Sequence, residues 1–193
     1  MSGAVQERLG QYHSLVRTYH RTLDLLSPGA LRDWARLEQG ALAFRDALLE
    51  VAPGARTVVD VGSGVGLPGI PMAIALPDVR FLLVERRRRR SAFLSLAVGQ
   101  LRLPNAEVFG GDVRDLEGVS CDAVTAQAVG SFSLLHEMTD HLHGGTVTLL
   151  SRKGPDWQDE IATLAAGTGL RPEARSFPLP DGAFIIAASL GRD

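Results

Sequence analysis

The sequence contains a single cysteine, Cys121, among 193 residues. One cysteine cannot form an internal disulfide, and neither a Cys-x-x-Cys pair nor a zinc-type spacing of cysteines and histidines is present. A reducing, cytoplasmic environment is therefore the simplest expectation. The sequence also lacks a run of about 18 apolar residues and a signal peptide's charged and apolar start, which weighs against a membrane-spanning or secreted protein.

The chain also has little excess of charge of either sign, since the formal net charge is only −2. This balance weighs against a strongly basic nucleic-acid binder. The distribution is uneven, because residues 80–114 contain 8 basic and 3 acidic side chains, a local charge of +5. Positive charge is thus concentrated in the middle third of the chain.

The chain is 45% hydrophobic and has no internal repeat or low-complexity linker, which is typical of one compact domain. We expect a single domain over residues 1–193, made of an N-terminal helical extension (1–52) and a Rossmann-like core (53–193). Apolar residues at steps of three and four predict two N-terminal helices, over residues 4–26 and 30–51.

Short apolar runs alternate with helical patterns through the rest of the chain, which is typical of βαβ units. Strands are predicted over residues 56–61, 80–85, 106–109, 122–126 and 146–150. Helices are predicted between them, over residues 70–76, 87–101, 131–142 and 156–167. Two final apolar runs flank the turn signal Pro180-Asp181-Gly182 and predict an antiparallel hairpin of residues 174–179 and 183–190. The expected fold is α/β, with a mostly parallel seven-stranded sheet and helices on both faces.

The most informative segment is the glycine-rich stretch from Asp60 to Pro71, which joins the first predicted core strand to a helix. Glycine lets the backbone turn sharply and approach a ligand, and free N–H groups at a helix start favour a carboxylate or phosphate. Glu85 ends the next strand, 19 residues beyond Gly66, where an acid can accept hydrogen bonds from both hydroxyls of a ribose. The two features predict a ligand with a ribose and a small anionic group at the carboxyl ends of the strands.

Two ligand classes fit this description, because Gly64-x-Gly66-x-x-Gly69 also matches the dinucleotide fingerprint. A nicotinamide enzyme usually needs a second substrate domain, and only about 120 residues follow the loop, enough to complete one sheet. A glycine turn with a purely structural role is a further reading. The Asp-x-Gly-x-Gly-x-Gly arrangement that begins at Asp60 resembles the first motif of class I S-adenosylmethionine methyltransferases, the reading that we favour.

This resemblance implies a Rossmann-like class I methyltransferase fold with S-adenosylmethionine as cofactor. The glycine loop would take the methionine portion, Glu85 the ribose, and the exit of the third strand the adenine. Gln127 would lie at the mouth of the site beside the transferable methyl group, which makes it the candidate catalytic residue. The residues expected at the cofactor are Asp60, Gly62, Ser63, Gly64, Gly66, Leu67, Glu85, Asp112, Val113, Arg114 and Gln127.

The loop is more specific still, because Gly62-x-Gly-x-Gly-Leu-Pro-Gly-Ile-Pro71 resembles the RsmG (GidB) family, bacterial enzymes that methylate guanine N7 in small-subunit ribosomal RNA. Arg89-Arg90 with Phe93-Leu94, and Arg152-Lys153-Gly154, are similar to further motifs of this family. The resemblance implies that 16S rRNA or the small ribosomal subunit is the partner. The residues that it suggests for RNA binding are Arg89, Arg90, Arg152 and Lys153.

Some family signatures are replaced in this chain. Family members usually carry Ser-Arg-Ala after strand four, where this chain reads Ala126-Gln127-Ala128. The family's Asn-Leu-Thr and Arg-His-x-x-Asp-Ser signatures in the N-terminal part are also absent. Two alternatives therefore stay open: a methyltransferase derived from this family that acts on a small heteroaromatic metabolite, and a non-catalytic protein that binds S-adenosylmethionine or RNA.

Methyl transfer from a sulfonium to guanine N7 requires alignment more than acid–base catalysis, because N7 has no proton to lose. An acceptor that carries a proton would need a base, for which His136, His141 and His143 are candidates by residue type. Solvated histidines at helix ends are the simpler expectation, and we expect no bound metal. The run Arg86–Arg90 at a predicted helix start is a candidate phosphate contact, although five consecutive arginines cover every face of a helix turn.

Overall fold

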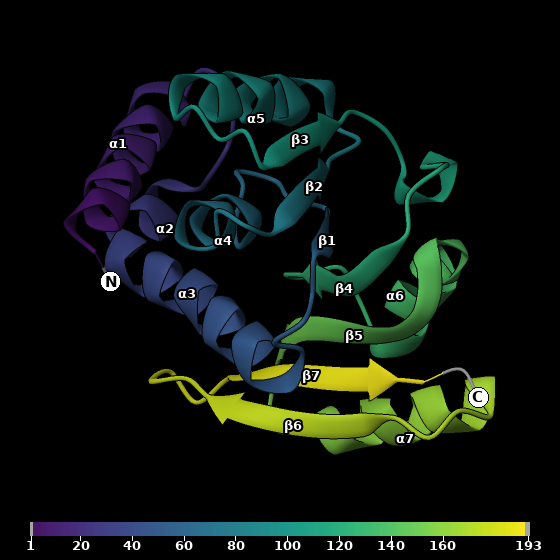
Figure 1. Cartoon of the computed structure of the whole chain (residues 1–193). Helices are drawn as coiled ribbons and strands as arrows, with labels where there is room; N and C mark the ends of the chain where they lie inside the picture. Colours follow the sequence, from purple (N-terminus) through teal and green to yellow (C-terminus); the bar gives the residue numbers. More distant parts are fainter. Residues whose placement is uncertain (1, 192–193) are drawn as a thin grey trace.

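A computed structural model describes residues 2–191 of the chain; Met1, Arg192 and Asp193, which the expected domain range includes, lie outside the described residues. Seven strands form one sheet in the order β3-β2-β1-β4-β5-β7-β6 (Figure 1). Strand β7 pairs antiparallel with both β5 and β6, while the other pairs are parallel. The strands are β1 (Thr57–Val61), β2 (Arg80–Val84), β3 (Ala106–Phe109), β4 (Cys121–Ala126), β5 (His143–Lys153), β6 (Glu173–Pro178) and β7 (Phe184–Leu190).

Helices cover both faces of this sheet, as expected (Figure 1). One face carries α1 (Gly3–Tyr19), α2 (Pro28–Arg32), α3 (Trp34–Val51), α4 (Gly69–Ala75) and α5 (Arg88–Gln100). The other face carries α6 (Phe132–Thr139), α7 (Trp157–Thr168) and the 3-10 turns η1 (Val113–Asp115) and η2 (Asp140–Leu142). Within residues 2–191, no helix combines the length and apolar character that a membrane span needs.

The N-terminal part differs from the prediction, because three helices replace the two expected over residues 4–26 and 30–51. Helix α1 ends at Tyr19, and the segment that follows turns with Asp24 at a positive φ of 51°. Aspartate tolerates this left-handed conformation better than most residues. The hydroxyl of Ser27 then accepts a hydrogen bond from the Ala30 N–H at 3.2 Å and begins α2, and Asp33 separates α2 from α3.

The C-terminal hairpin is confirmed, since β6 and β7 pair along their whole length and a turn joins Leu179 to Ala183. Strand β7 lies between β5 and β6, so β6, the first strand of the hairpin, forms the edge of the sheet. Strand β5 is longer than the predicted 146–150, because its last three residues continue the ladder with β7.

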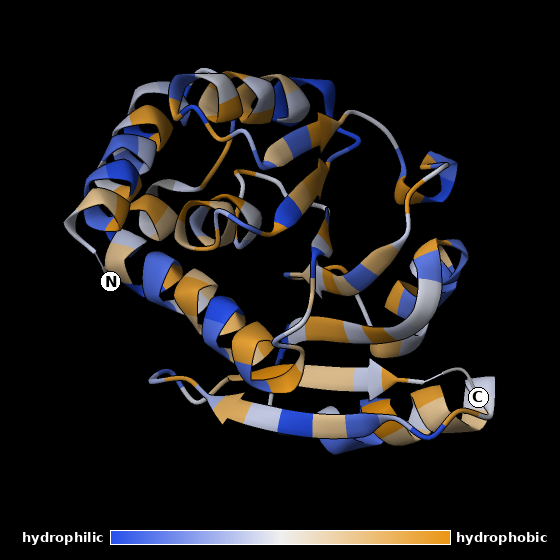
Figure 2. Cartoon of the chain, in the orientation of Figure 1, coloured by the Kyte–Doolittle hydropathy of each residue, from blue (hydrophilic) through white to orange (hydrophobic). Residues whose placement is uncertain are grey.

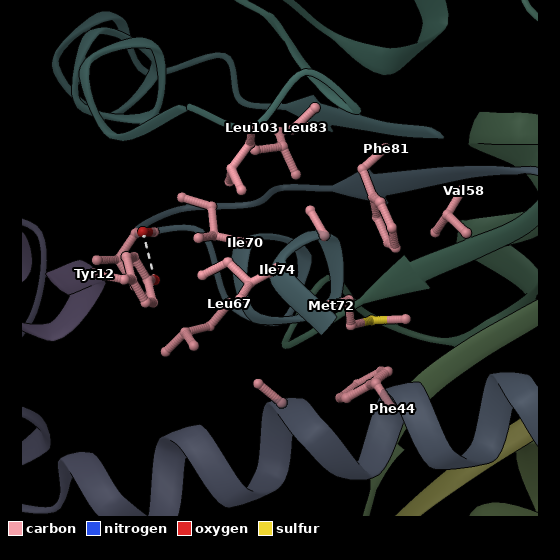
Figure 3. Packing of buried hydrophobic residues seen from close by; sticks show 14 of the residues in the cluster. Tyr12, Phe44, Val58, Leu67, Ile70, Met72, Ile74, Phe81, Leu83 and Leu103 are labelled. Carbon is pink, nitrogen blue, oxygen red and sulfur yellow. Dashed lines mark hydrogen bonds between the residues drawn. The ribbon is translucent and has the colours of Figure 1, made fainter. Parts of the chain in front are cut away.

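A hydrophobic core lies on each side of the sheet. On the first side, α4 is packed between the sheet and the helices α1 and α3, and Figure 3 shows Ile70 and Met72 of α4 in one hydrophobic cluster with Phe44 of α3 and Phe81 of β2. Charged and polar residues lie between these apolar positions along α1 and α3 (Figure 2). The apolar spacing of these helices therefore buries one stripe and leaves the rest in water.

Tyr12 connects helix α1 to the glycine-rich loop. Its ring is fully buried, and its hydroxyl donates a 2.9 Å hydrogen bond to the carbonyl oxygen of Val65 (Figure 3). Burial raises the pKa of this hydroxyl well above its ordinary value, so Tyr12 remains a neutral donor. The N-terminal helices thus hold the loop at its middle residue.

Replacing Tyr12 by phenylalanine is expected to lower the free energy of unfolding by about 1–2 kcal/mol, because the Val65 carbonyl loses its buried donor. Urea unfolding monitored by circular dichroism measures this change. Tyr19→Phe is the matched control, since the Tyr19 ring packs against Phe93 and keeps that contact in the variant. Equal stability of Tyr12→Phe and the parent would show that the bond does not hold the loop.

Candidate functional site

A pocket of about 550 Å³ opens at the carboxyl ends of β1, β2 and β4. The strand order reverses between β1 and β4, and ligands of open α/β sheets bind at such a switch point. Loops after all three strands, the η1 turn and one side of α6 surround the pocket. Its lining residues are Val61, Gly62, Val84, Glu85, Arg86, Arg87, Arg90, Gly111, Asp112, Val113, Arg114, Gln127, Ala128, Val129, Leu134 and Met138.

The glycine-rich loop reaches the pocket at Gly62. Gly66 has a φ of 104°, and a Cβ at this position would lie 2.5 Å from Cδ1 of Ile70, so only glycine fits without displacement. Gly62 also has a positive φ, of 67°, and a Cβ there would come within 3.0 Å of Val129 at the pocket wall. The N–H of Ser63 donates to the carbonyl of Val84 at 3.0 Å, which ties the loop to the end of β2.

Glu85 is the carboxylate that the pocket is built around. Its side chain is buried, and its two oxygens accept hydrogen bonds from different backbone groups: Oε2 from the Gly64 N–H at 3.0 Å and Oε1 from the Arg87 N–H at 2.8 Å. Glu85 thereby joins the glycine loop to the turn before α5. Each carboxylate oxygen has a further lone pair, so the group can still accept hydrogen bonds from a ligand in the pocket.

Asp60 lies behind the pocket and does not line it. The side chain is fully buried, its Oδ1 accepts a 2.7 Å hydrogen bond from the Thr125 hydroxyl, and its Oδ2 faces Gly69 at the start of α4. A Cβ at Gly69 would come within 2.6 Å of this oxygen. Burial raises the pKa of Asp60 to about 6, against the opposing effect of its hydrogen bonds. Asp60 therefore braces the glycine loop from below.

The predicted cofactor residues fall into two groups, those that line the pocket and those that lie behind it. Gly62, Glu85, Asp112, Val113, Arg114 and Gln127 line the pocket. Asp60, Ser63, Gly64, Gly66 and Leu67 shape the loop around it and do not line it. Contact of these five residues with the cofactor stays a prediction.

The η1 turn closes the adenine end predicted from the sequence. Asp112 accepts a hydrogen bond from the backbone N–H of Arg114 at 3.1 Å. Its carboxylate also forms an ion pair with the Arg114 guanidinium at 3.0 Å. These contacts hold the pKa of the Asp112 carboxyl below its ordinary value. Asp112 is thus a fixed anion at the rim.

Several lining residues were missed by the sequence reasoning. Leu134 and Met138 come from one face of α6, and their spacing of four on a predicted helix was the available signal. Arg86 and Arg87 also line the pocket, although the sequence pointed only to phosphate contacts for this run. Their neighbour Arg90 lines it as well and donates a 3.4 Å hydrogen bond to the Asp24 carbonyl.

The four residues predicted to bind RNA lie in different settings. Arg89 is exposed, Arg90 is partly buried at the pocket, and Arg152 forms a 2.6 Å ion pair with Asp181. Lys153 does not fit the prediction, because its side chain is buried. Its ammonium group donates to the Gly130 carbonyl at 2.6 Å and to Glu160 at 2.7 Å. These two bonds use two of the three N–H donors of the ammonium group.

A smaller hollow of about 160 Å³ adjoins the pocket at Gln127, which lines both. Arg36 of α3 and Arg152 of β5 line this hollow, and both pair with Asp181 in the β6–β7 turn. The larger pocket thus continues past Gln127 into a polar hollow. Two binding partners can meet at this residue.

Solved structures with this architecture include methyltransferases. The chain superposes on a magnesium protoporphyrin IX methyltransferase of Synechocystis PCC 6803 with bound SAM, with a TM-score of 0.65, 15% identity and coverage of 94% of this chain and 97% of that one. It superposes on M. jannaschii TYW2 in complex with AdoMet with a TM-score of 0.61, 18% identity and coverage of 80% and 77%. The fold is that of the class I S-adenosylmethionine methyltransferases.

Sequence comparison identifies the family. The GidB profile, described as rRNA small subunit methyltransferase G, matches residues 6–173. A ribosomal RNA small subunit methyltransferase G of Neisseria meningitidis serogroup C is 35% identical over 164 residues, 85% of this chain and 78% of that protein. The Desulfotalea psychrophila protein of the same name is 31% identical over 91% of this chain and 83% of its own length. The chain belongs to the GidB family and is an S-adenosylmethionine-dependent methyltransferase.

Proposed function

We propose that this protein transfers a methyl group from S-adenosylmethionine to N7 of a guanine in 16S ribosomal RNA of the small subunit. The observation that carries the proposal is the pocket at the strand ends, where the Glu85 carboxylate faces the glycine loop, in a chain of the GidB family. The proposed substrate places the reaction in the cytoplasm. The small ribosomal subunit is the proposed macromolecular partner.

The residues of the pocket fit S-adenosylmethionine. Glu85 would accept hydrogen bonds from the ribose hydroxyls, the loop at Gly62 leaves room where a side chain would fill the cradle, and Val113 offers an apolar surface to the adenine. When bound, the cofactor supplies a sulfonium methyl group. Asp112 and Arg114 form the rim on the adenine side.

The chain needs only to align the acceptor, because guanine N7 offers a lone pair and loses no proton. Gln127 is the proposed residue at the reacting centre, since it lies where the cofactor pocket and the smaller hollow meet. Its side-chain amide can both donate and accept hydrogen bonds to a base edge. Arg36 and Arg152 of the hollow supply positive charge for the adjoining phosphates.

Incubation with methyl-labelled S-adenosylmethionine and small ribosomal subunits that lack the N7 modification tests this proposal. Nuclease digestion is expected to release labelled 7-methylguanosine. Cofactor binding without labelled nucleoside would reject the rRNA substrate and favour the small heteroaromatic acceptor. Absence of turnover on either kind of acceptor would leave a binding protein without catalysis.

The exposed arginines at the start of α5 are proposed to contact RNA phosphates. In the double variant Arg88→Ala/Arg89→Ala, the slope of log K against log salt for RNA binding is expected to fall by about 0.7–0.9 per lost contact. Cofactor affinity should stay the same, because neither side chain lines the pocket. Fluorescence anisotropy with a labelled rRNA fragment at several salt concentrations measures the slope.

Arg80→Ala is the control for this experiment. Arg80 is also exposed but begins β2, at the sheet edge opposite the pocket, where it pairs with Glu107. An unchanged slope in the double variant, or an equal loss in Arg80→Ala, would contradict a specific role for the α5 arginines.

A further inference from the structure

A cluster of two histidines and a carboxylate lies at the end of α6 that is remote from the strand ends around the pocket. His136 comes from α6, Asp140 from η2, and His143 is the first residue of β5. Oδ1 of Asp140 lies 3.5 Å from Nε2 of His136 and 3.8 Å from Nδ1 of His143. One ligand atom from each residue lies within 4.8 Å of the others, and the two rings stand edge to face.

The hydrogen bond on the far side of His143 determines which of its ring nitrogens carries a proton. The Thr139 hydroxyl donates its one proton to the Leu135 carbonyl at 2.8 Å. The same oxygen lies 3.0 Å from His143 Nε2, so it must accept there, and Nε2 is the protonated nitrogen. Nδ1 of a neutral His143 therefore directs its lone pair toward the Asp140 carboxylate.

A lone pair and a carboxylate that face each other in a buried site repel each other. Either a proton on Nδ1, which makes the contact an ion pair, or a metal ion bound between the two groups removes this repulsion. The His143 side chain is only 2% exposed, so water screens this contact poorly. A histidine that ligates a metal characteristically donates its other ring N–H to an oxygen, as His143 does to Thr139. The local arrangement is that of a metal ligand already oriented by its neighbour.

We propose that His136, Asp140 and His143 bind a divalent transition-metal ion of the zinc class. Two imidazole nitrogens and one carboxylate oxygen are a common ligand set for Zn²⁺. Tetrahedral zinc with bonds of about 2.0–2.1 Å separates its ligand atoms by roughly 3.3–3.5 Å. The two separations from Asp140, 3.5 and 3.8 Å, therefore need only a small contraction, and the two histidine nitrogens lie within 4.8 Å of each other.

The neighbouring surface leaves room for a fourth ligand. A hollow of about 620 Å³ is lined by Ser133, His136 and Asp140, which share one side of the α6–η2 segment. The Ser133 hydroxyl oxygen is buried and has no hydrogen-bond partner among residues 2–191. A water molecule on the ion would satisfy this hydroxyl. The site is thus suited to three protein ligands and one water.

The proposed ion would join the end of α6 to the first residue of β5. Leu134 and Met138 of the same helix line the cofactor pocket, but the three ligands do not. The ion is therefore structural and takes no part in methyl transfer. This proposal departs from the sequence-based expectation of a metal-free protein and is independent of the acceptor proposed above.

Titration of the tag-free, metal-stripped protein with Co²⁺ tests the site. Binding should produce the visible absorption bands of low-symmetry Co²⁺, and added Zn²⁺ should abolish them by displacement. Zn²⁺ should also raise the melting temperature. His136→Ala and Asp140→Asn, both at partly exposed positions, should lose the bands and the thermal shift. Thr139→Val should lower the affinity about 10–100-fold, because His143 loses its orienting partner.

His141→Gln is the matched control, because His141 lies in the same segment but contacts the Leu116 carbonyl and not the cluster. It should bind Co²⁺ like the parent protein. Failure of the parent protein to bind Co²⁺ or Zn²⁺ would overturn the proposal. Equal binding by His136→Ala and the parent would also overturn it, since the metal would then be held elsewhere.

Discussion

Replacing Glu85 by alanine is expected to weaken S-adenosylmethionine binding on the order of 100-fold or more. Hydrogen bonds to a charged acceptor contribute about 1.5–3 kcal/mol each. The substitution removes the two such bonds that the ribose hydroxyls would donate to Glu85. The substitution also frees the Gly64 and Arg87 N–H groups that the carboxylate now holds. The loop would lose one of its contacts with the end of β2 and keep the other, from the Ser63 N–H to the Val84 carbonyl. Isothermal titration calorimetry measures the dissociation constant directly.

Glu107→Ala is the matched control for this measurement. Glu107 is a carboxylate on the adjacent strand β3, but it is exposed and pairs with Arg80 away from the pocket. Its removal should leave cofactor affinity unchanged. A lowered melting temperature of Glu85→Ala with unchanged affinity would show that Glu85 only supports the loop, and the assignment to the ribose would fail.

The juxtaposition of the glycine loop and Glu85 could be predicted from the sequence because it follows from the fold class alone. Parallel strands present their carboxyl ends at one sheet edge, and the register pairs Val61 with Val84, so the next residues on each strand are neighbours. Nothing beyond strand order and strand ends was needed. The resemblance to class I methyltransferases was needed to place Asp112 and Gln127 at the cofactor.

The side of the loop on which a residue lies could not be predicted in this way. Asp60 belongs to the same motif as Gly62, but the Thr125 hydroxyl on β4 and the start of α4 enclose it. Lys153 reads as a surface cation after a strand, yet Gly130 and Glu160 from two other segments bind its ammonium group. In each case one partner is distant in sequence, 65 residues away for Thr125 and 23 for Gly130, so the local pattern carries no signal of burial.

The end of the first helix was predicted wrongly for a related reason. The apolar spacing of residues 4–26 continues past Tyr19, but the chain turns there and begins α2 at the Ser27 cap. Helix α1 packs against α4 and α5, and these contacts determine where the helix ends. Tertiary packing thus overrode a spacing that by itself favours a longer helix.

Between pH 4 and pH 7, the buried Asp60 carboxyl is expected to lower the free energy of unfolding by about 3 kcal/mol relative to Asp60→Asn. Its pKa is raised from 3.8 to about 6 in the folded protein, mainly by burial. Over this range the folded state therefore binds more protons than the unfolded state. Stability must then fall as pH rises from about 4 to 6, and it levels off above the folded pKa.

Urea unfolding of the parent and Asp60→Asn at half-unit pH steps measures this difference, because the contributions of other titrating groups cancel between the two proteins. Thr125→Val supplies a second test. Loss of the Thr125 hydroxyl removes a hydrogen bond that lowers the pKa of Asp60, so the fall in stability should extend to higher pH. A stability difference that stays flat with pH would mean that the Asp60 carboxylate is fully solvated or compensated in the folded state. Ionisation of Asp60 would then cost no free energy in the folded protein. Its support of the glycine loop would come from packing alone.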